Sequence, residues 1–177
     1  MKRKIDLNEY GTQILKAIPQ GVLLNTKVGQ KFDSMVIGWG GIGTNWGLPV
    51  FTVYVREGRF TRQQLDANPE FTVSVPLDGV NAEIARVCGR KSGRNTDKVS
   101  EAGLTLEEPE VNHVPGIREY PLTLECRVLY RQAQELDRYP EKALKFYPQD
   151  VGSENCGANK DVHVMYIGEI VDAYIIG

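Results

Sequence analysis

The order of apolar and polar residues predicts a chain built mostly of β-strands. Residues 71–75 alternate cleanly, and residues 122–128 place every second, apolar side chain on one inward face. Residues 35–39 are apolar throughout, as in a strand that is covered on both faces. Further strands are predicted at residues 22–24, 50–55 and 162–176. In the last of them, Gly168 predicts a bulge or a bend.

Short helices are predicted between the strands, largely from their capping residues. Thr61 and Gln64 have the spacing of a capping box, so a helix should begin at Thr61. Asn81 and Asp97 are suitable N-caps, and Gly89 is a suitable terminator. The predicted helices cover residues 8–17, 61–68, 81–88, 97–103 and 141–146. Mostly antiparallel strands with small inserted helices favour a mainly β fold, a β-barrel decorated by short peripheral helices.

Length and composition narrow the class of protein. The 177 residues suit a single domain over residues 1–177. Lys and Arg number 21 against 23 Asp and Glu, so no overall basic field suggests nucleic acid as a partner. No apolar run could span a bilayer, and the N-terminus lacks the apolar region of a signal peptide. Three widely spaced cysteines without a CxxC pair predict a reduced, cytoplasmic protein that is not membrane-bound.

The segment from Arg56 to Gln64 joins a predicted strand to a predicted helix and is a candidate phosphate site. A helix start leaves free N–H groups and a partial positive charge. Arg56 and Arg59 precede it, and Thr61 adds a hydroxyl. Free amides, a hydroxyl and two guanidiniums at one corner can bind a phosphate. The alternative is a capped helix with two solvated arginines.

Residues 38–43 match the G-x-G-x-x-G pattern of dinucleotide-binding proteins, but their context does not fit. The next strand begins near residue 50, so the residues needed for a crossover helix are missing. We therefore expect an irregular turn that carries Trp39 and Trp46. The two indoles could flank a flat aromatic ligand, or they could be core or dimer-interface residues.

A second candidate anion site lies at the turn Ser92-Gly93, among Arg86, Arg90, Lys91, Arg94 and Lys98. These residues could contact a phosphate or a nucleotide tail, or they could form a solvated basic loop. The neighbouring Cys88 falls at the predicted end of a helix, where the dipole disfavours a thiolate. We expect it to be a buried thiol.

Other catalytic patterns are absent from the sequence. It contains two histidines, His113 and His163, and neither belongs to an H-E-x-x-H motif, so a catalytic metal is not expected. No G-x-S-x-G elbow occurs either. On the strand alternation His163 shares a face with Met165, Ile167 and Glu169, where it could be structural or could respond to a bound anion.

Three segments, taken together, resemble the flavin reductase-like proteins, which include the flavoredoxins and have the FMN-binding split-barrel fold. The first runs from the Met35–Trp39 stretch through Trp46, Pro49, Val53, Arg56, Arg59 and Thr61. The second combines Ser92-Gly93-Arg94 with Asp97-Lys98, and the third is His163 followed by Gly168-Glu169-Ile170. They extend over most of the chain in the family's order.

The resemblance implies a homodimer with one FMN per subunit, near the subunit interface. It places the phosphate at the corner of Arg56, Arg59 and Thr61, the ring along residues 35–38 and 53–55, and the loop around Cys88 over the cofactor. It also implies a nicotinamide-binding, catalytic role for His163. The implied cofactor-binding residues are Met35, Val36, Ile37, Gly38, Trp39, Val53, Tyr54, Val55, Arg56, Arg59, Thr61, Cys88, Gly89, Ser92, Gly93 and Lys98.

The chain departs from the family pattern at two places. Relatives often have Asn and Thr flanking the methionine of the first segment, where this chain has Asp33 and Val36. Backbone amides would then have to bind the pyrimidine edge of the flavin. Relatives also often place Asp directly before the histidine of the third segment, where this chain has Val162.

The function implied by the resemblance is that of an FMN-dependent oxidoreductase. NAD(P)H would reduce the bound flavin, and the electrons would pass to a small-molecule or protein acceptor. The alternative is a flavin-binding electron carrier or sensor without its own nicotinamide reaction. A third reading is a barrel that holds haem or a pyridoxal-type phosphate, although no axial histidine or cofactor-linking lysine stands out.

Overall fold

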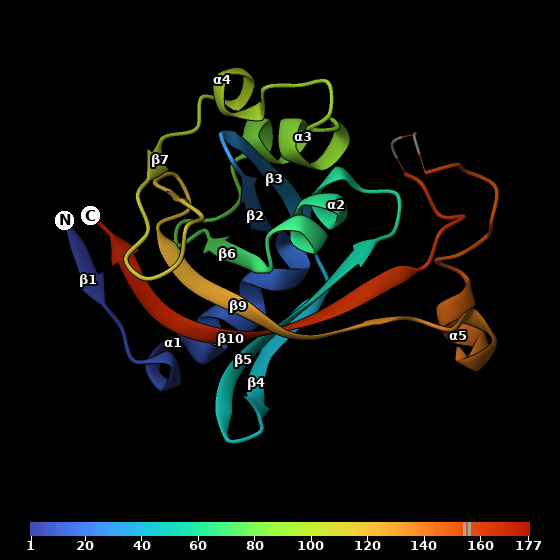
Figure 1. Cartoon of the computed structure of the whole chain (residues 1–177), viewed down its shortest axis with the longest axis horizontal. Coiled ribbons are helices and arrows are strands. Elements are labelled where there is room, and N and C mark those ends of the chain that lie inside the picture. The colour runs from blue at the N-terminus through green and yellow to red at the C-terminus, as the bar shows by residue number, and fades with distance from the viewer. Residues whose placement is uncertain (154, 156) are drawn as a thin grey trace.

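The structure is a computed structural model that describes residues 1–153, 155 and 157–177. Its main feature is one antiparallel sheet with the strand order β3-β2-β6-β9-β10-β5-β4, and β1 pairs with the far end of β10 (Figure 1). A separate two-stranded ladder is formed by β7 and β8. The strands are β1 Lys2–Lys4, β2 Val22–Val28, β3 Lys31–Ile37, β4 Gly40–Asn45, β5 Leu48–Arg56, β6 Glu70–Val75, β7 Leu106–Glu107, β8 Gly116–Ile117, β9 Leu122–Ala133 and β10 His163–Ile176.

The two end strands of the sheet are neighbours in the sequence. β3 ends at Ile37 and β4 begins at Gly40, so only Gly38 and Trp39 connect them. A sheet whose opposite ends are joined by so short a link must curl strongly on itself. Among the described strands no ladder pairs β3 with β4, so the curled sheet stays open there. The expected mainly β, antiparallel architecture is confirmed.

Helices are short and lie around this sheet. They are α1 Leu7–Ala17, α2 Phe60–Ala67, α3 Ala82–Arg90, α4 Lys98–Ala102 and α5 Glu141–Leu144, with the 3-10 turns η1 Ile18–Gln20 and η2 Leu136–Arg138. In Figure 1, α2, α3 and α4 cover the side of β2 and β3, whereas α5 lies apart, beside the far ends of β9 and β10. No helix in the described part of the chain is long and apolar enough to cross a membrane.

Two of the capping predictions are confirmed, and two are wrong. Asn81 accepts hydrogen bonds from the N–H groups of Glu83 and Ile84, and Asp97 caps α4 in the same way. α2, however, begins at Phe60 with Arg59 as its N-cap, so the predicted capping box does not form. α3 also continues through the predicted terminator Gly89 to Arg90.

The glycine-rich segment after β3 is a strand, not the irregular turn that we predicted. It forms β4, which pairs with β5 in a hairpin whose tip is Trp46-Gly47, both with positive φ. The absence of a crossover helix at this point is confirmed, since β4 and β5 are antiparallel neighbours. The strand begins at Gly40, where φ is +145° and an added Cβ would lie 2.5 Å from the carbonyl oxygen of Thr52.

The core forms between the sheet faces as the alternation predicts. Phe71, Leu122, Leu124 and Cys126 are fully buried in one cluster. The predicted irregularity at Gly168 is confirmed as a register shift between β9 and β10. An added Cβ at Gly168 would lie 2.6 Å from the Phe71 ring, so the glycine lets this ring pack against the β10 backbone.

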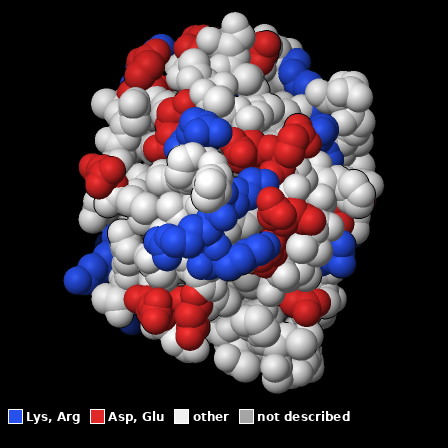
Figure 2. All heavy atoms as spheres, turned by 90° about the vertical axis from the view of Figure 1, so that its left-hand side faces the viewer, with Lys and Arg blue, Asp and Glu red and all other residues white. Residues whose placement is uncertain are grey.

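Charges on the face that carries the two termini are mixed. In Figure 2 the Lys and Arg side chains on this face lie beside Asp and Glu side chains. Lys2 pairs with Glu110 at 2.8 Å, and Arg118 pairs with Glu107 at 2.6 Å. Opposite charges in contact leave no large field of one sign on this face.

Candidate functional site

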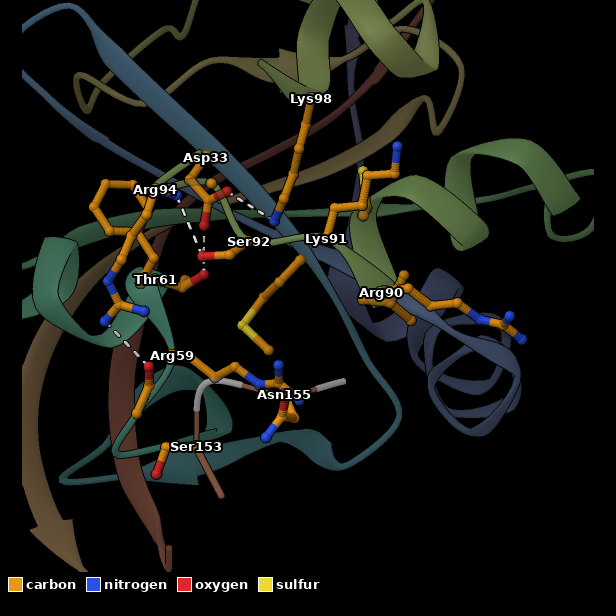
Figure 3. Close-up of a pocket in the computed structure, with 17 residues that line it drawn as sticks. Asp33, Arg59, Thr61, Arg90, Lys91, Ser92, Arg94, Lys98, Ser153 and Asn155 are labelled. Carbon is orange, nitrogen blue, oxygen red and sulfur yellow. Dashed lines mark hydrogen bonds and ion pairs between the residues drawn. The ribbon is translucent and has the colours of Figure 1, made fainter. Parts of the chain in front are cut away.

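Two hollows meet where β3, α2, α3 and the end of β5 come together. Met35, Val36 and Arg59 line both of them, so they form one continuous depression. We name the first the basic hollow (Figure 3); its walls are Asp33, Met35, Val36, Gly58, Arg59, Phe60, Thr61, Cys88, Gly89, Arg90, Lys91, Ser92, Gly93, Arg94, Lys98, Ser153 and Asn155. The second is the aromatic hollow, lined by Met35, Val36, Ile37, Gly38, Trp39, Tyr54, Arg56, Arg59 and His163.

The depression brings together nearly all of the residues singled out in the sequence. Among the implied cofactor-binding residues, the exceptions are Val53 and Val55, which are fully buried in the core. Trp46 and Arg86 also lie outside both hollows. Alternation along β5 places Tyr54 and Arg56 on the opposite face, in the aromatic hollow. On β3, Met35 and Val36 are half-buried rather than covered on both faces as predicted, because they form the wall that the hollows share.

A buried ion pair forms one wall of the basic hollow. The Nζ of Lys98 lies 2.8 Å from Oδ1 of Asp33 and donates to the carbonyl of Ser34 at 2.7 Å. Lys98 and Asp33 are only 5% and 1% exposed. The Thr61 hydroxyl donates to Oδ2 of the same carboxylate at 2.6 Å (Figure 3). Asp33 therefore engages two of the donors that the sequence analysis assigned to an anion.

Arg59 has a different situation from its neighbours. Its half-buried guanidinium has no hydrogen-bond or ion-pair partner within the described part of the chain. Beside it, the N–H groups of Phe60 and Thr61 in the first turn of α2 also find no acceptor among the described residues. A guanidinium next to free helix N–H groups, in a concave wall, is a suitable environment for an anion.

Two basic side chains at α3 and just after it are neutralised by the protein itself. Arg86 on α3 pairs with Glu83, and Lys91 pairs with Glu101, so the solvated alternative describes these two residues well. Arg94 bends over the basic hollow, where it donates to the carbonyl of Gly58 at 3.1 Å and lies over the Phe60 ring.

The turn before Arg94 fits closely against the hollow. An added Cβ at Gly93 would lie 2.2 Å from Oδ1 of Asp33, so this position has room only for glycine. Cys88 is a buried free thiol, as predicted, and burial raises its pKa. Cys126 is likewise buried and free, whereas Cys156 lies outside the described residues.

Arg56 binds the segment that follows α5. One guanidinium nitrogen donates to the carbonyl of Asp161 at 2.7 Å, and the other donates to the carbonyl of Phe146 at 3.1 Å. The guanidinium also lies 4.8 Å from the centre of the Tyr147 ring. Burial lowers the pKa of Arg56. The structure thus gives Arg56 internal partners in place of the free position expected for a phosphate ligand.

His163 begins β10 directly opposite Arg56 on β5. Its Nδ1 lies 2.6 Å from the Tyr147 hydroxyl, and its ring is 4.9 Å from that of Trp39. Burial, followed by the positive charge of Arg56, lowers the pKa of His163 to about 3. The imidazole is therefore neutral at pH 7.

The two tryptophans occupy separate places. Trp39 is 40% exposed in the wall of the aromatic hollow, and its ring meets that of Phe146 edge-on at 5.1 Å. Trp46 is 61% exposed at the tip of the β4–β5 hairpin. Neither indole is in the core, so the alternative that they are core residues is wrong.

Several contributors to the site escaped sequence reasoning. Phe146, Tyr147 and Asp161 contact Arg56 and His163 of the aromatic hollow from the segment between α5 and β10, which has no regular periodicity. Ser153 and Asn155 reach the basic hollow from the same segment. Only a run of aromatic residues at 146–147 marks it, and such a run fits an ordinary loop equally well.

The family assignment follows from the match over the whole region that builds these hollows. A family model described as the flavin reductase like domain matches residues 15–177. The chain belongs to this family. Membership of this family supports a flavin-related redox function for the chain. Among curated proteins, none matches the chain.

Solved structures share the fold. A flavoredoxin from Methanosarcina acetivorans is 25% identical with a TM-score of 0.63, over 89% of this chain and 68% of that one. An FMN-binding domain of a flavin reductase-like enzyme from Shewanella baltica is 16% identical, with a TM-score of 0.64 over 99% and 77%. An NADH:FAD oxidoreductase from Streptomyces globisporus is 19% identical, with a TM-score of 0.59 over 89% and 76%. The expected split-barrel fold is confirmed by these likenesses.

Proposed function

We propose that the chain binds FMN in the joined hollows and acts as an FMN-dependent oxidoreductase that uses NAD(P)H. The observation that carries the proposal is Arg59, which is unpaired within the described chain and stands beside the free N–H groups of α2, where the two hollows meet. Membership of the flavin reductase like family supports a flavin as the ligand. An anionic tail with a flat ring matches a depression that is basic at one end and aromatic at the other.

The residues present fit such a group. The first turn of α2 and Arg59 would hold the phosphate, while Arg94 would border it from the rim. Met35 to Trp39 and Tyr54 would hold the ring. When bound, FMN supplies an acceptor for hydride from NAD(P)H and a donor of electrons to a small-molecule or protein acceptor.

The protein's own part in this chemistry is to position the group, exclude water and provide fixed dipoles. Asp33 neutralises Lys98, so the wall behind the proposed phosphate position is rigid and adds little net charge. His163 is uncharged at pH 7 and can donate or accept one hydrogen bond at the ring edge. In this proposal His163 contacts the bound molecules without changing its own protonation state.

The proposal includes a homodimer. Trp39, Trp46 and Phe146 are large aromatic residues that are 40%, 61% and 46% exposed, as residues at an interface between subunits would be in an isolated chain. Light scattering after size-exclusion chromatography should give twice the 19.8 kDa mass of the chain. A monomeric mass would remove this part of the proposal and leave flavin binding in place.

The decisive experiment is a visible spectrum of the purified protein, followed by titration with FMN. Flavin absorbance that remains with the protein after desalting supports the proposal, and so does saturable quenching of FMN fluorescence. A colourless protein that leaves added FMN unperturbed would rule the proposal out.

Stopped-flow mixing of the FMN-loaded protein with NADH and with NADPH tests the reaction itself. Bleaching of bound flavin faster than of free flavin by either nucleotide identifies a reductase. Bleaching by neither identifies an electron carrier or sensor. The likeness to a flavoredoxin is the observation that supports this second candidate function, an electron carrier or sensor.

A further inference from the structure

The contact between Tyr147 and His163 links the segment between α5 and β10 to the aromatic hollow. The Tyr147 hydroxyl and Nδ1 of His163 are 2.6 Å apart, and each residue is only 7% exposed. Nε2 of His163 forms no hydrogen bond within the described residues, and His163 lines the aromatic hollow. One ring nitrogen is thus occupied by the protein, and the other remains for a bound molecule.

The direction of this hydrogen bond follows from the acidities of the two groups. A phenol with a pKa near 10 is a much stronger donor than a neutral imidazole N–H. The unprotonated nitrogen of imidazole, whose conjugate acid has a pKa near 6.5, is a stronger acceptor than a phenolic oxygen. The favoured arrangement is therefore O–H of Tyr147 donating to Nδ1 of His163. This arrangement leaves the single ring proton of a neutral histidine on Nε2.

We propose that Tyr147 is a positioning residue, whose hydroxyl fixes the Nε2–H tautomer of His163 and so presents an N–H donor to the aromatic hollow. An acceptor atom on the bound molecule, such as a carbonyl oxygen or an unprotonated ring nitrogen, would be recognised by this donor. The inference rests on the proposed function only for the identity of that molecule.

The protein holds Tyr147 in place through Arg56. The guanidinium donates to the carbonyls of Phe146 and Asp161 and lies over the Tyr147 ring, so both ends of the segment between α5 and β10 are fixed to β5. The charged groups acting on His163 are Arg56, Asp161 and Arg59. Burial and the two arginines keep the ring neutral, and neutrality is the condition under which a tautomer can be selected.

The test is nitrogen NMR of the whole protein with 15N-labelled histidine at pH 7. The chain has two histidines, so each spectrum contains His163 and an internal reference, the exposed His113 beside Glu70. We expect His163 to show a pyridine-like Nδ1 and a pyrrole-like Nε2. In Tyr147→Phe the ratio of the Nε2–H tautomer to the Nδ1–H tautomer should fall by roughly threefold to tenfold, which is the equilibrium shift of one typical hydrogen bond. Because burial and Arg56 remain, the ring should stay neutral in this variant.

Tyr130→Phe is the control, because it removes a tyrosine hydroxyl that donates to Gln132 and has no contact with Tyr147 or His163. It should leave the His163 tautomer unchanged. Urea unfolding midpoints close to that of the native protein show that both variants are folded. A pyrrole-like Nδ1 in the native protein would overturn the inference, and so would the native tautomer persisting in folded Tyr147→Phe.

The outcome for the proposed function is read separately, by adding FMN to the same labelled sample. A shift of the His163 Nε2 signal places the bound molecule at this donor. If FMN fails to bind while the tautomer depends on Tyr147, the positioning role stands and the proposed function fails. If FMN binds while the tautomer is independent of Tyr147, the reverse conclusion holds.

Discussion

The basic hollow and the aromatic hollow hold the cations in their walls in different ways. In the basic hollow, Lys98 faces the carboxylate of Asp33, so the two charges cancel inside the wall. In the aromatic hollow, Arg56 faces carbonyl oxygens and a tyrosine ring, and its neighbour His163 is uncharged. Arg59 stands between them and, within the described residues, has no partner.

This difference teaches which charges a ligand could use. A cation that already has a carboxylate partner offers little to an incoming phosphate, because its desolvation has been compensated within the protein. A cation bound only by carbonyls mainly fixes chain segments in place. The unpaired guanidinium of Arg59, which is half-buried whereas Arg90 is exposed, can then gain a new interaction with an anion on binding.

The largest effect is expected when the compensated pair is broken. Asp33→Ala leaves the ammonium of Lys98 buried at 5% exposure without its carboxylate. Losing one partner of a buried pair costs about 3–5 kcal/mol of unfolding free energy. Urea unfolding of the variant and the native protein measures this loss.

Glu101→Ala is the matched control for that substitution. It removes the carboxylate from the ion pair with Lys91, where both side chains are about one-third exposed. An ion pair of this kind contributes less than about 1 kcal/mol. Equal losses in the two variants would show that the Asp33 pair is no better shielded from water than the surface pair.

The second largest effect, on FMN affinity, is expected when Arg59 is replaced. Arg59→Ala should weaken FMN binding by roughly tenfold or more, since a charge-assisted hydrogen bond contributes about 1.5–3 kcal/mol. Riboflavin, which lacks the phosphate, should bind the variant and the native protein alike. Fluorescence titrations with both flavins measure the two affinities.

Arg56→Ala separates the two arginines. Because Arg56 fixes the segment around Phe146 and Asp161, its loss should weaken FMN and riboflavin to a similar extent. A phosphate-specific loss in Arg56→Ala, together with an unchanged FMN affinity in Arg59→Ala, would move the phosphate from Arg59 to Arg56.

These contacts also explain how much of the fold could be predicted. Asn81 and Asp97 cap helices through N–H groups two or three residues away, and alternation places Leu122 and Leu124 in the core. Such features depend on neighbouring residues, so the sequence pattern reports them. The glycine-rich strand β4 was mistaken for a turn because its glycines have low strand propensity, and its pairing with β5 outweighs that preference.

The site was predictable as a set of residues but not as a set of partners. The corner of Arg56, Arg59 and Thr61 does line the depression. The Thr61 hydroxyl, however, bonds to Asp33, 28 residues away, and Arg56 bonds to the carbonyl of Phe146, 90 residues away. No local spacing encodes contacts of that range, so the sequence could not tell which cation would remain free.

A third effect tests the neutrality of the aromatic hollow. In the unfolded chain His163 takes up a proton near pH 6.5, whereas in the folded protein its pKa is lowered to about 3. The unfolded state therefore binds more protons between these values. The contribution of His163 to the unfolding free energy is fully present above about pH 6.5 and is lost as the pH is lowered towards 3. From pH 7 to 5 this group alone should cost about 2 kcal/mol.

The measurement is urea unfolding at pH 7 and pH 5 for the native protein and His163→Asn. Other titrating groups contribute equally to both proteins. The difference between the two proteins in how far the unfolding free energy falls from pH 7 to pH 5 therefore isolates His163. If the unfolding free energy fell equally from pH 7 to pH 5 in the native protein and in His163→Asn, the histidine would be accessible to protons in the folded state.

The smallest effect is expected at the rim of the basic hollow. Arg94 is exposed and already donates to the carbonyl of Gly58, so its charge is screened by water and salt. Arg94→Ala should weaken FMN binding by less than about fivefold, and the effect should shrink at high salt. Arg86→Ala, which removes a cation already paired with Glu83, should have no effect. If the Arg94 variant lost more affinity than the Arg59 variant at both salt concentrations, the anion would lie at the rim, and the assignment of the unpaired arginine between the hollows would be wrong.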